Sequence, residues 1–247
     1  MTSRWSPVAA SLVLLAACGS APGRPARGSE VLAPGEVVEF RALYAANCAG
    51  CHGQQGRGGA AIPLANPVYL GIADDTSIRK VTADGVRGTA MPAFAQSAGG
   101  MLTDAQIDVI TSGVRSWEQA GALDGANPPP HVATTAGDPR RGAAAFGTYC
   151  ASCHGARGEG GPKGSAITNG SFLALISDQG LRTIVIAGRA DLGAPDWRAY
   201  LPGRPMSDQE VGDVVAWLAS QRVESPGQPY AALSDAASRS ASNDLPR

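Results

Sequence analysis

Apolar residues recur at helical spacing in two separate stretches of the chain that share one pattern. Ahead of each of two Cys-Xaa-Xaa-Cys-His sequences, apolar side chains stand three or four positions apart, Phe40 and Tyr44 in the first stretch and Ala143 and Phe146 in the second. This spacing places both side chains on one face of a helix. We therefore expect a helix to run up to each of these two sequences.

Two more helices are predicted in each stretch. One pair covers residues 75–84 and 178–187, and each helix is followed by a glycine, the residue type favoured just past a helix end. The last pair begins at Thr103 and Ser207, where a hydroxyl residue and the Gln or Glu three positions later match the capping-box pattern. The segments between these helices are predicted to be loops, so the expected fold class is all-α, with short helices and long loops.

An internal repeat relates the two stretches. Residues 48–52 (CAGCH) recur as residues 150–154 (CASCH), and residues 66–94 align without a gap on residues 169–197. Two small domains related by duplication account for this. Outside them, glycine, proline and small residues without apolar periodicity are typical of tethers and linkers. The predicted division is a signal peptide (1–17), a flexible tether (18–35), domain 1 (36–118), a Pro-rich linker (119–137), domain 2 (138–224) and a disordered tail (225–247).

The first residues carry the pattern of an export signal. Arg4 is followed by an apolar run from Val8 to Ala17 that is too short to cross a bilayer as a mature helix. The run ends in LAAC, which resembles the lipobox of bacterial lipoproteins and implies cleavage before Cys18 and acylation of that cysteine. An ordinary signal peptide cleaved a little later is the alternative. Two or three acyl chains at Cys18 would hold the protein stably at a membrane surface.

Composition narrows the class of protein. At 44% hydrophobic residues and a formal net charge of −1, the chain is neither a disordered polyanion nor a basic nucleic-acid binder. The 32 glycines, nearly twice the average share of about 7%, indicate turn-rich segments. Only 5% of the residues are aromatic, so each predicted core is short of bulky side chains and something else must fill it.

A Cys-Xaa-Xaa-Cys sequence has three chemical interpretations: half a zinc site, a redox-active dithiol, or a haem anchor. Two of the three histidines in the chain, His52 and His154, directly follow such a pair, which favours haem attachment. A zinc site would place its two pairs about 15–20 residues apart, and export to an oxidising compartment disfavours free thiols. We predict two covalent c-type haems, with His52 and His154 as iron ligands and thioether bonds to Cys48, Cys51, Cys150 and Cys153.

Each repeat resembles a class I cytochrome c domain in its C-x-x-C-H motif, and the whole chain resembles the tandem dihaem c-type cytochromes of bacterial respiratory chains. The resemblance implies that a methionine on the loop before the last helix binds the other face of the iron, often within a Met-Pro pair. The sequence GTAMPAF supplies Met91 at this place. Such a thioether ligand raises the reduction potential. The alternative is Met101, for which packing against the start of the next helix is the favoured interpretation.

The second repeat departs from this pattern. Ala194 takes the position of Met91, and alanine cannot bind iron. Met206 is the remaining methionine of this repeat and is our predicted sixth ligand. The alternatives are a five-coordinate or water-bound iron, or a ligand from elsewhere such as His131 or Lys163.

Met206 also has a structural interpretation. The alignment pairs it with Leu102, immediately before a helix cap, where an apolar side chain packs on one a turn later, here Val211. Arg79 and Arg182, which the repeat also pairs, could neutralise haem propionates or lie exposed on a helix. The sequence leaves both questions open.

The leading functional hypothesis is a membrane-anchored electron-transfer cytochrome rather than an enzyme. It would accept single electrons from a quinol-oxidising complex or a dehydrogenase and pass them to a terminal oxidase or a soluble cytochrome on the extracytoplasmic face of a membrane. No nucleic acid is expected as a partner. The competing hypotheses are a dihaem peroxidase or reductase, and a haem-based gas sensor, both of which need an open second iron.

Overall fold

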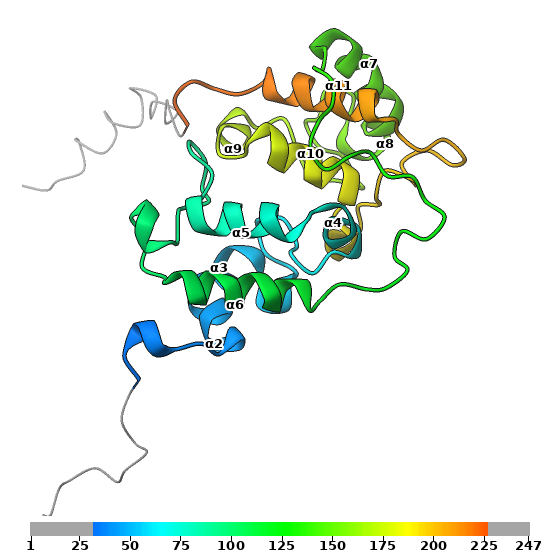
Figure 1. The fold of residues 1–247 in the computed structure, drawn as a ribbon. Coiled ribbons are helices and arrows are strands. Elements are labelled where there is room, and N and C mark those ends of the chain that lie inside the picture. Colours follow the sequence, from blue (N-terminus) through cyan, green and yellow to red (C-terminus); the bar gives the residue numbers. More distant parts are fainter. Residues whose placement is uncertain (1–31, 227–247) are drawn as a thin grey trace, which may run out of the picture. The chain divides into compact units, whose positions relative to one another are not determined.

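The computed structural model describes residues 32–226 (Figure 1). The described residues from Val38 onward belong to one compact unit, and residues 32–37 belong to another, which holds the short 3-10 helix η2 (Pro34–Glu36). The predicted signal peptide, Cys18, most of the tether and nearly all of the tail lie outside the described residues. Within the described part of the chain the fold is all-α, as predicted: it has ten α-helices, and its only β-type pairings are two isolated bridges.

Both repeats contain the same succession of α-helices, and the first has one additional 3-10 helix, η3. The first repeat consists of α2 (Phe40–Asn47), α3 (Ala49–His52), η3 (Gln54–Gly56), α4 (Pro67–Ile72), α5 (Asp75–Asp84), η4 (Gln96–Ala98) and α6 (Asp104–Arg115). The second consists of α7 (Pro139–Tyr149), α8 (Ala151–His154), α9 (Gly170–Ala174), α10 (Asp178–Ala187), η5 (Ala190–Leu192) and α11 (Asp208–Ala219). The six predicted helices are therefore confirmed as α2, α5, α6, α7, α10 and α11.

Side-chain caps fix where the principal helices begin. Thr103 and Ser207 each accept a hydrogen bond from the third backbone N–H of α6 and α11, and Gln106 and Glu210 reciprocate, as the capping-box pattern predicts. Gly85 and Gly188 follow α5 and α10 with a φ of +66°, a value that favours glycine. The capping residues and the terminal glycines therefore located these helix ends correctly.

The prediction that only loops lie between these helices is wrong at α4 and α9. Both are one to two turns long, too short to show an apolar period. Their side-chain caps are Asn66, which accepts from Val68 N, and Asn169, which accepts from Phe172 N. Asn66 and Asn169 are paired by the internal repeat, and as N-cap residues they were the available signal for these helices.

Each repeat packs its first helix across its last. Phe40 and Tyr44 of α2 surround Trp117, with ring centroids 5.3 and 5.0 Å from it. In the second repeat Phe146 stacks on Trp217 at 4.3 Å, and Gly142 allows the backbones of α7 and α11 to meet, because a Cβ there would stand 2.0 Å from the carbonyl oxygen of Asp213. These contacts hold the helix that leads into each C-x-x-C-H motif.

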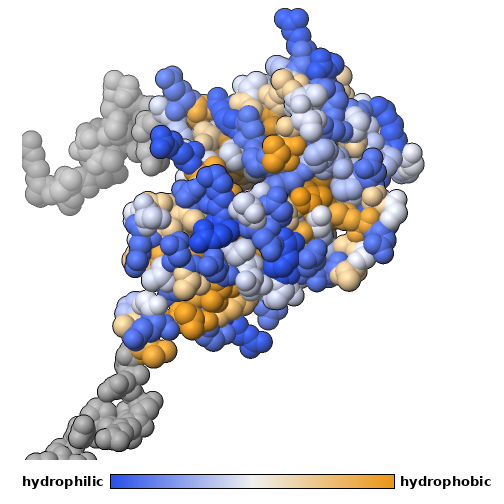
Figure 2. Space-filling view, in the orientation of Figure 1, coloured by the Kyte–Doolittle hydropathy of each residue, from blue (hydrophilic) through white to orange (hydrophobic). Residues whose placement is uncertain are grey.

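Met101 does not pack against the following helix. Its side chain is 80% exposed, which contradicts the packing interpretation given above. The preceding Gly99 turns the backbone at a φ of +88°, and Leu102 enters the core instead. Figure 2 shows that apolar residues on the displayed face lie in small patches separated by polar ones.

The Pro-rich linker lies along α10. Arg182 is 3% exposed and donates hydrogen bonds to the carbonyl oxygens of Pro130 and His131 and to the carboxylate of Asp208. Arg79, its counterpart in the first repeat, is exposed and pairs with two aspartates of α6. The two arginines therefore have different surroundings despite their common register. No helix among the described residues is long and apolar enough to cross a membrane.

The two repeats also contact each other within the compact unit. Asn66 Nδ2 donates to the carbonyl oxygen of Ala187 at 3.0 Å, which brings the start of α4 to the end of α10 (Figure 1). On a second part of the contact, Ala90 N donates to the carbonyl oxygen of Leu175 at 3.3 Å. Ala90 immediately precedes Met91, so the predicted axial segment of the first repeat lies near this contact.

Candidate functional site

The first C-x-x-C-H motif is a single helical turn attached to the end of α2. Cys48 ends α2 and opens α3, where His52 is the last residue. Tyr44 of α2 donates its hydroxyl to the carbonyl oxygen of Gly53 at 3.0 Å, directly after the histidine. Cys48 is buried and Cys51 is exposed, so one thiol faces the interior and the other faces the surface.

The orientation of His52 leaves one ring nitrogen available. Nδ1 lies 2.8 Å from the carbonyl oxygen of Ile62 and must donate, because a carbonyl only accepts. Nε2 is then unprotonated, and no described residue makes a hydrogen bond to it. Burial lowers the pKa of His52, the bond to Ile62 opposes this, and the charge of Arg189 lowers it further. A buried neutral imidazole held through its other nitrogen is the usual arrangement of a histidine that binds metal.

The second motif repeats this geometry. His154 ends α8, and its Nδ1 donates to the carbonyl oxygen of Ser165 at 2.7 Å. Gly164 passes beside the ring, where a Cβ would stand 2.9 Å from His154 Nδ1. His154 is less buried than His52.

The first cysteine of each motif, Cys48 or Cys150, lies in surroundings that favour the neutral thiol. Burial, with a smaller contribution from the neighbouring cysteine, raises the pKa of Cys48 to about 11 and that of Cys150 to about 12. All four motif cysteines are free of disulfide bonds. Among residues 32–226, no three His, Cys, Asp or Glu side chains come together as a candidate metal cluster. Each motif offers two free thiols and one histidine, the groups that thioether attachment of a haem and binding of its iron require.

The loop before the last helix aligns the two repeats in space as it does in sequence. Val86 N donates to the carbonyl oxygen of Met91 at 3.0 Å, and Arg189 N donates to that of Ala194 at 3.0 Å. Ala194 thus occupies the backbone position that Met91 has in the first repeat. The side chain of Met91 is partly exposed, whereas Ala194 offers a methyl group that cannot bind iron.

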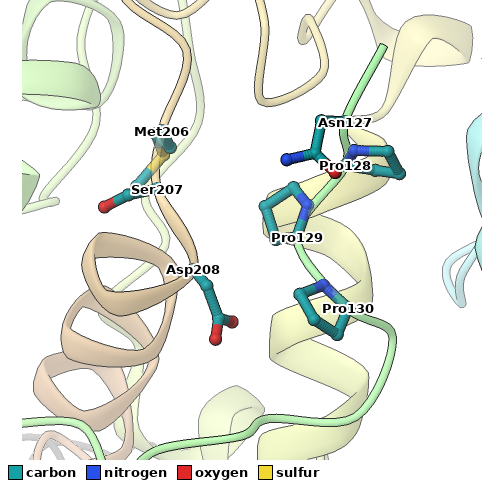
Figure 3. Close-up of a pocket in the computed structure, with 7 residues that line it drawn as sticks. All are labelled: Asn127, Pro128, Pro129, Pro130, Met206, Ser207 and Asp208. Atoms are coloured by element: carbon teal, nitrogen blue, oxygen red, sulfur yellow. The ribbon is translucent and has the colours of Figure 1, made fainter.

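Met206 occupies the register of Leu102. Its N–H donates to the carbonyl oxygen of Trp197 at 3.0 Å, as that of Leu102 does to Phe94 at 2.8 Å, and both side chains are buried. Met206 also lines a cavity of about 400 Å³ (Figure 3). Ser207 and Asp208 lie beside it, and the linker residues Asn127–Pro130 form the opposite wall. Met206 as an iron ligand stays a prediction.

His131 and Lys163, the alternative ligands of the second iron, lie in different parts of the structure. The ring of His131 lies against Tyr69 with centroids 6.3 Å apart, and its Nε2 is 3.3 Å from Thr183 Oγ1. Lys163 is exposed on the loop that follows the second motif. The structure therefore gives His131 a place in the linker contact with both repeats.

Sequence reasoning missed the backbone carbonyls that orient the histidines. Ile62 and Ser165 lie ten and eleven residues beyond their histidines, in loops without periodicity. The glycines that follow each motif were the available signal, since a loop that returns against a helical turn needs them. A Cβ on Gly59, for example, would stand 2.2 Å from the carbonyl oxygen of Cys51.

Two protein-family models match the chain. The model described as cytochrome C oxidase, cbb3-type, subunit III matches residues 35–112, and the model described as cytochrome c matches residues 139–222. These ranges contain the two C-x-x-C-H motifs and the axial loops described above.

Curated relatives match parts of the chain. The Cbb3-type cytochrome c oxidase subunit CcoP of Azospirillum sp. (strain B510) is 34% identical over 131 residues, which are 49% of this chain and 40% of that protein. The cytochrome bc1 complex cytochrome c subunit of Mycobacterium bovis is 26% identical over 182 residues, 71% of this chain and 60% of that protein. The chain thus spans about half the length of the curated relatives it matches. A chain of the Kuenenia stuttgartiensis reducing HAO-like protein complex aligns with a TM-score of 0.43 and 19% identity over 78% of this chain and 100% of its own length.

Proposed function

We propose that this chain, which carries two cytochrome c domains in tandem, transfers single electrons between redox proteins through two covalently bound c-type haems. One observation carries the proposal. Two histidines, each directly after a Cys-Xaa-Xaa-Cys pair, are both held through Nδ1 by a backbone carbonyl, which leaves Nε2 free for iron. A bound haem supplies an iron that alternates between the ferric and ferrous states.

The first haem is proposed to have a closed coordination sphere. Cys48 and Cys51 would hold it by thioether bonds, His52 would bind the iron from α3, and Met91 would bind the opposite side. Ile62 fixes the tautomer and orientation of His52 through its carbonyl oxygen. A methionine ligand favours ferrous iron and raises the potential. This set suits repeated electron transfer without exchange of ligands.

The second haem is proposed to bind Cys150 and Cys153 by the same chemistry, with His154 as one ligand. Met206 is the proposed sixth ligand, because it is buried and is the remaining methionine of this repeat. Its register with Leu102 argues for a packing role. The two haems would therefore differ in how firmly their sixth position is filled.

The location and partners follow from the same proposal. Acylation of Cys18 would anchor the chain to a membrane with both haem domains on the extracytoplasmic side. The named relatives are subunits of a cbb3-type oxidase and of a bc1 complex, which supports respiratory donors and acceptors for this chain. We propose a quinol-oxidising complex or a dehydrogenase as donor, a terminal oxidase or a soluble cytochrome as acceptor, and no bond-making catalysis.

A second candidate function rests on Ala194. Where the first repeat offers Met91, this residue offers no ligand, so the second iron could bind a small molecule. A dihaem peroxidase or reductase, or a gas sensor, would use such a site. A peroxidase would also need a distal acid–base group, and the remaining histidine, His131, lies in the linker contact.

Carbon monoxide distinguishes the two functions, because it binds only ferrous haem with an exchangeable sixth position. We expect the visible spectrum of the reduced protein to stay unchanged under carbon monoxide, and the Met206→Ala variant to change at one haem. A change at one haem of the unaltered protein, identical in Met206→Ala, would reject Met206 as ligand and favour the second candidate.

A further inference from the structure

Residues 188–194 of the second repeat form the loop that corresponds to the Met91 loop of the first repeat, and we call them the second axial loop. This loop is bonded to the other repeat through charged side chains. This loop has the register of the segment that ends at Met91, but it ends at Ala194. Two charged side chains on it, Arg189 and Asp191, are only 12% and 10% exposed. Charged side chains are seldom so buried without a specific partner.

Arg189 and Asp191 form a bidentate pair that reaches across to the first repeat. Arg189 Nε lies 3.0 Å from Asp191 Oδ1, and Nη2 lies 2.9 Å from Oδ2. The same Nη2 donates to the carbonyl oxygen of Gly59 at 2.7 Å, and Asp191 Oδ2 accepts from Gly58 N at 3.1 Å. The hydrogen bond from Arg189, opposed in part by burial, lowers the pKa of Asp191, so the Asp191 carboxylate is charged at neutral pH.

The turn that they bind lies directly on the first C-x-x-C-H motif. A Cβ on Gly59 would stand 2.2 Å from the carbonyl oxygen of Cys51 and 2.6 Å from the carbonyl carbon of His52. No side chain fits between this turn and the motif. The guanidinium of Arg189, which is bonded to Gly59, is therefore separated from the motif only by the backbone of this turn.

A third hydrogen bond fixes the contact close by. Asn66 is 6% exposed, and its Nδ2 donates to the carbonyl oxygen of Ala187, two residues before Arg189. Asn66 Oδ1 at the same time caps α4. The end of α10 and residues 188–194 are thus attached to the first repeat at two places after its motif, at Gly58–Gly59 and at Asn66.

We infer that Arg189 and Asp191 are positioning residues that hold residues 188–194 on the first C-x-x-C-H motif, and that their opposite charges offset each other's effect on the reduction potential of the first haem. This inference rests on the proposed function. Neither residue binds iron. A ferric haem has one more positive charge than a ferrous haem, so the guanidinium favours the ferrous state and the carboxylate favours the ferric state.

Potentiometric titration of single variants tests the inference. Arg189→Gln leaves the carboxylate alone beside the motif, and we expect the ferrous-to-ferric ratio of the first haem at a fixed potential to fall about three- to tenfold. Asp191→Asn leaves the guanidinium alone, and we expect the ratio to rise by a similar factor. A tenfold change corresponds to about 59 mV for one electron. The first haem is identified as the one whose potential moves in Met91→Ala.

The control is a second pair on the loop that leads to the last helix. Arg198 and Asp196 are also two residues apart and ion-paired at 2.6 Å, but Arg198 stacks over Trp197. We expect Arg198→Gln and Asp196→Asn to leave the first haem unchanged. Shifts of the same sign in Arg189→Gln and Asp191→Asn, or no shift in either, would overturn the inference while two redox-active haems would still support the proposed function.

The double variant covers the case in which a single charge unfolds the contact. Arg189→Gln with Asp191→Asn keeps similar shapes and removes both charges. We expect its first-haem potential to return close to that of the unaltered protein. A displacement of the double variant as large as that of Arg189→Gln alone would show that geometry, and not charge, sets the potential.

Discussion

A chain that carries Cys150→Ala and Cys153→Ala together is expected to hold one covalent haem in place of two. Each cysteine forms one thioether bond, so removal of both leaves the second porphyrin without a covalent link. Intact-mass measurement under denaturing conditions should find the mass of a single haem, and the haem absorbance per chain should fall by half. The matching variant of the first motif, Cys48→Ala with Cys51→Ala, should give the same count.

Loss of the second haem is also expected to destabilise the second repeat. A haem held by Cys150, Cys153 and His154 would add apolar contacts to this repeat, and these contacts are lost when both thioether bonds are removed. Ser152→Ala is the control, because it alters the same helical turn and keeps both thiols. Two haems remaining on the double-cysteine variant after denaturation would contradict thioether attachment at this motif.

The Met91→Ala variant is expected to lower the potential of the first haem. Loss of the thioether removes the ligand that favours ferrous iron. Axial ligands move haem potentials over about 0.8 V, so a decrease on the order of 0.1 V or more is expected. The open position should also make the first haem reactive toward carbon monoxide. A spectroscopic redox titration with and without carbon monoxide measures both effects.

Met101→Ala is the matched control for Met91→Ala. Met101 lies ten positions later and is 80% exposed, so its removal should change neither the potential nor the response to carbon monoxide. An unchanged first haem in Met91→Ala, with a lowered potential in Met101→Ala, would exchange the two assignments.

Local sequence signals predicted most of the fold correctly. Thr103 and Ser207 located the last helices because a capping box depends on residues three positions apart. Gly85 and Gly188 located the ends of α5 and α10 because glycine readily adopts the positive φ found just past a helix end. The short helix α4 was missed because one to two turns show no period, although Asn66 and the proline after it were in view.

Long-range contacts could not be predicted in this way. Arg189 gave no signal, because its partner Gly59 lies 130 residues earlier and the bond exists only once both repeats are folded. Arg182 and Arg79 share one register but have different partners, since only Arg182 faces the linker. The hydrogen bond from His52 to the carbonyl oxygen of Ile62 could not be predicted for another reason. Every residue has a backbone carbonyl, so the type of residue 62 does not indicate that its carbonyl accepts this bond.

An anaerobic potentiometric titration of the unaltered protein tests the central claim most directly. If the chain transfers single electrons through two haems, the haem absorption should change in two reversible steps. Each step should follow the slope of a one-electron couple, about 59 mV per tenfold change in ratio. The fully reduced protein should then give two electrons per chain to an oxidised soluble cytochrome c. A single haem, an irreversible step, or a reduced protein that consumes peroxide but leaves the cytochrome oxidised would contradict the account.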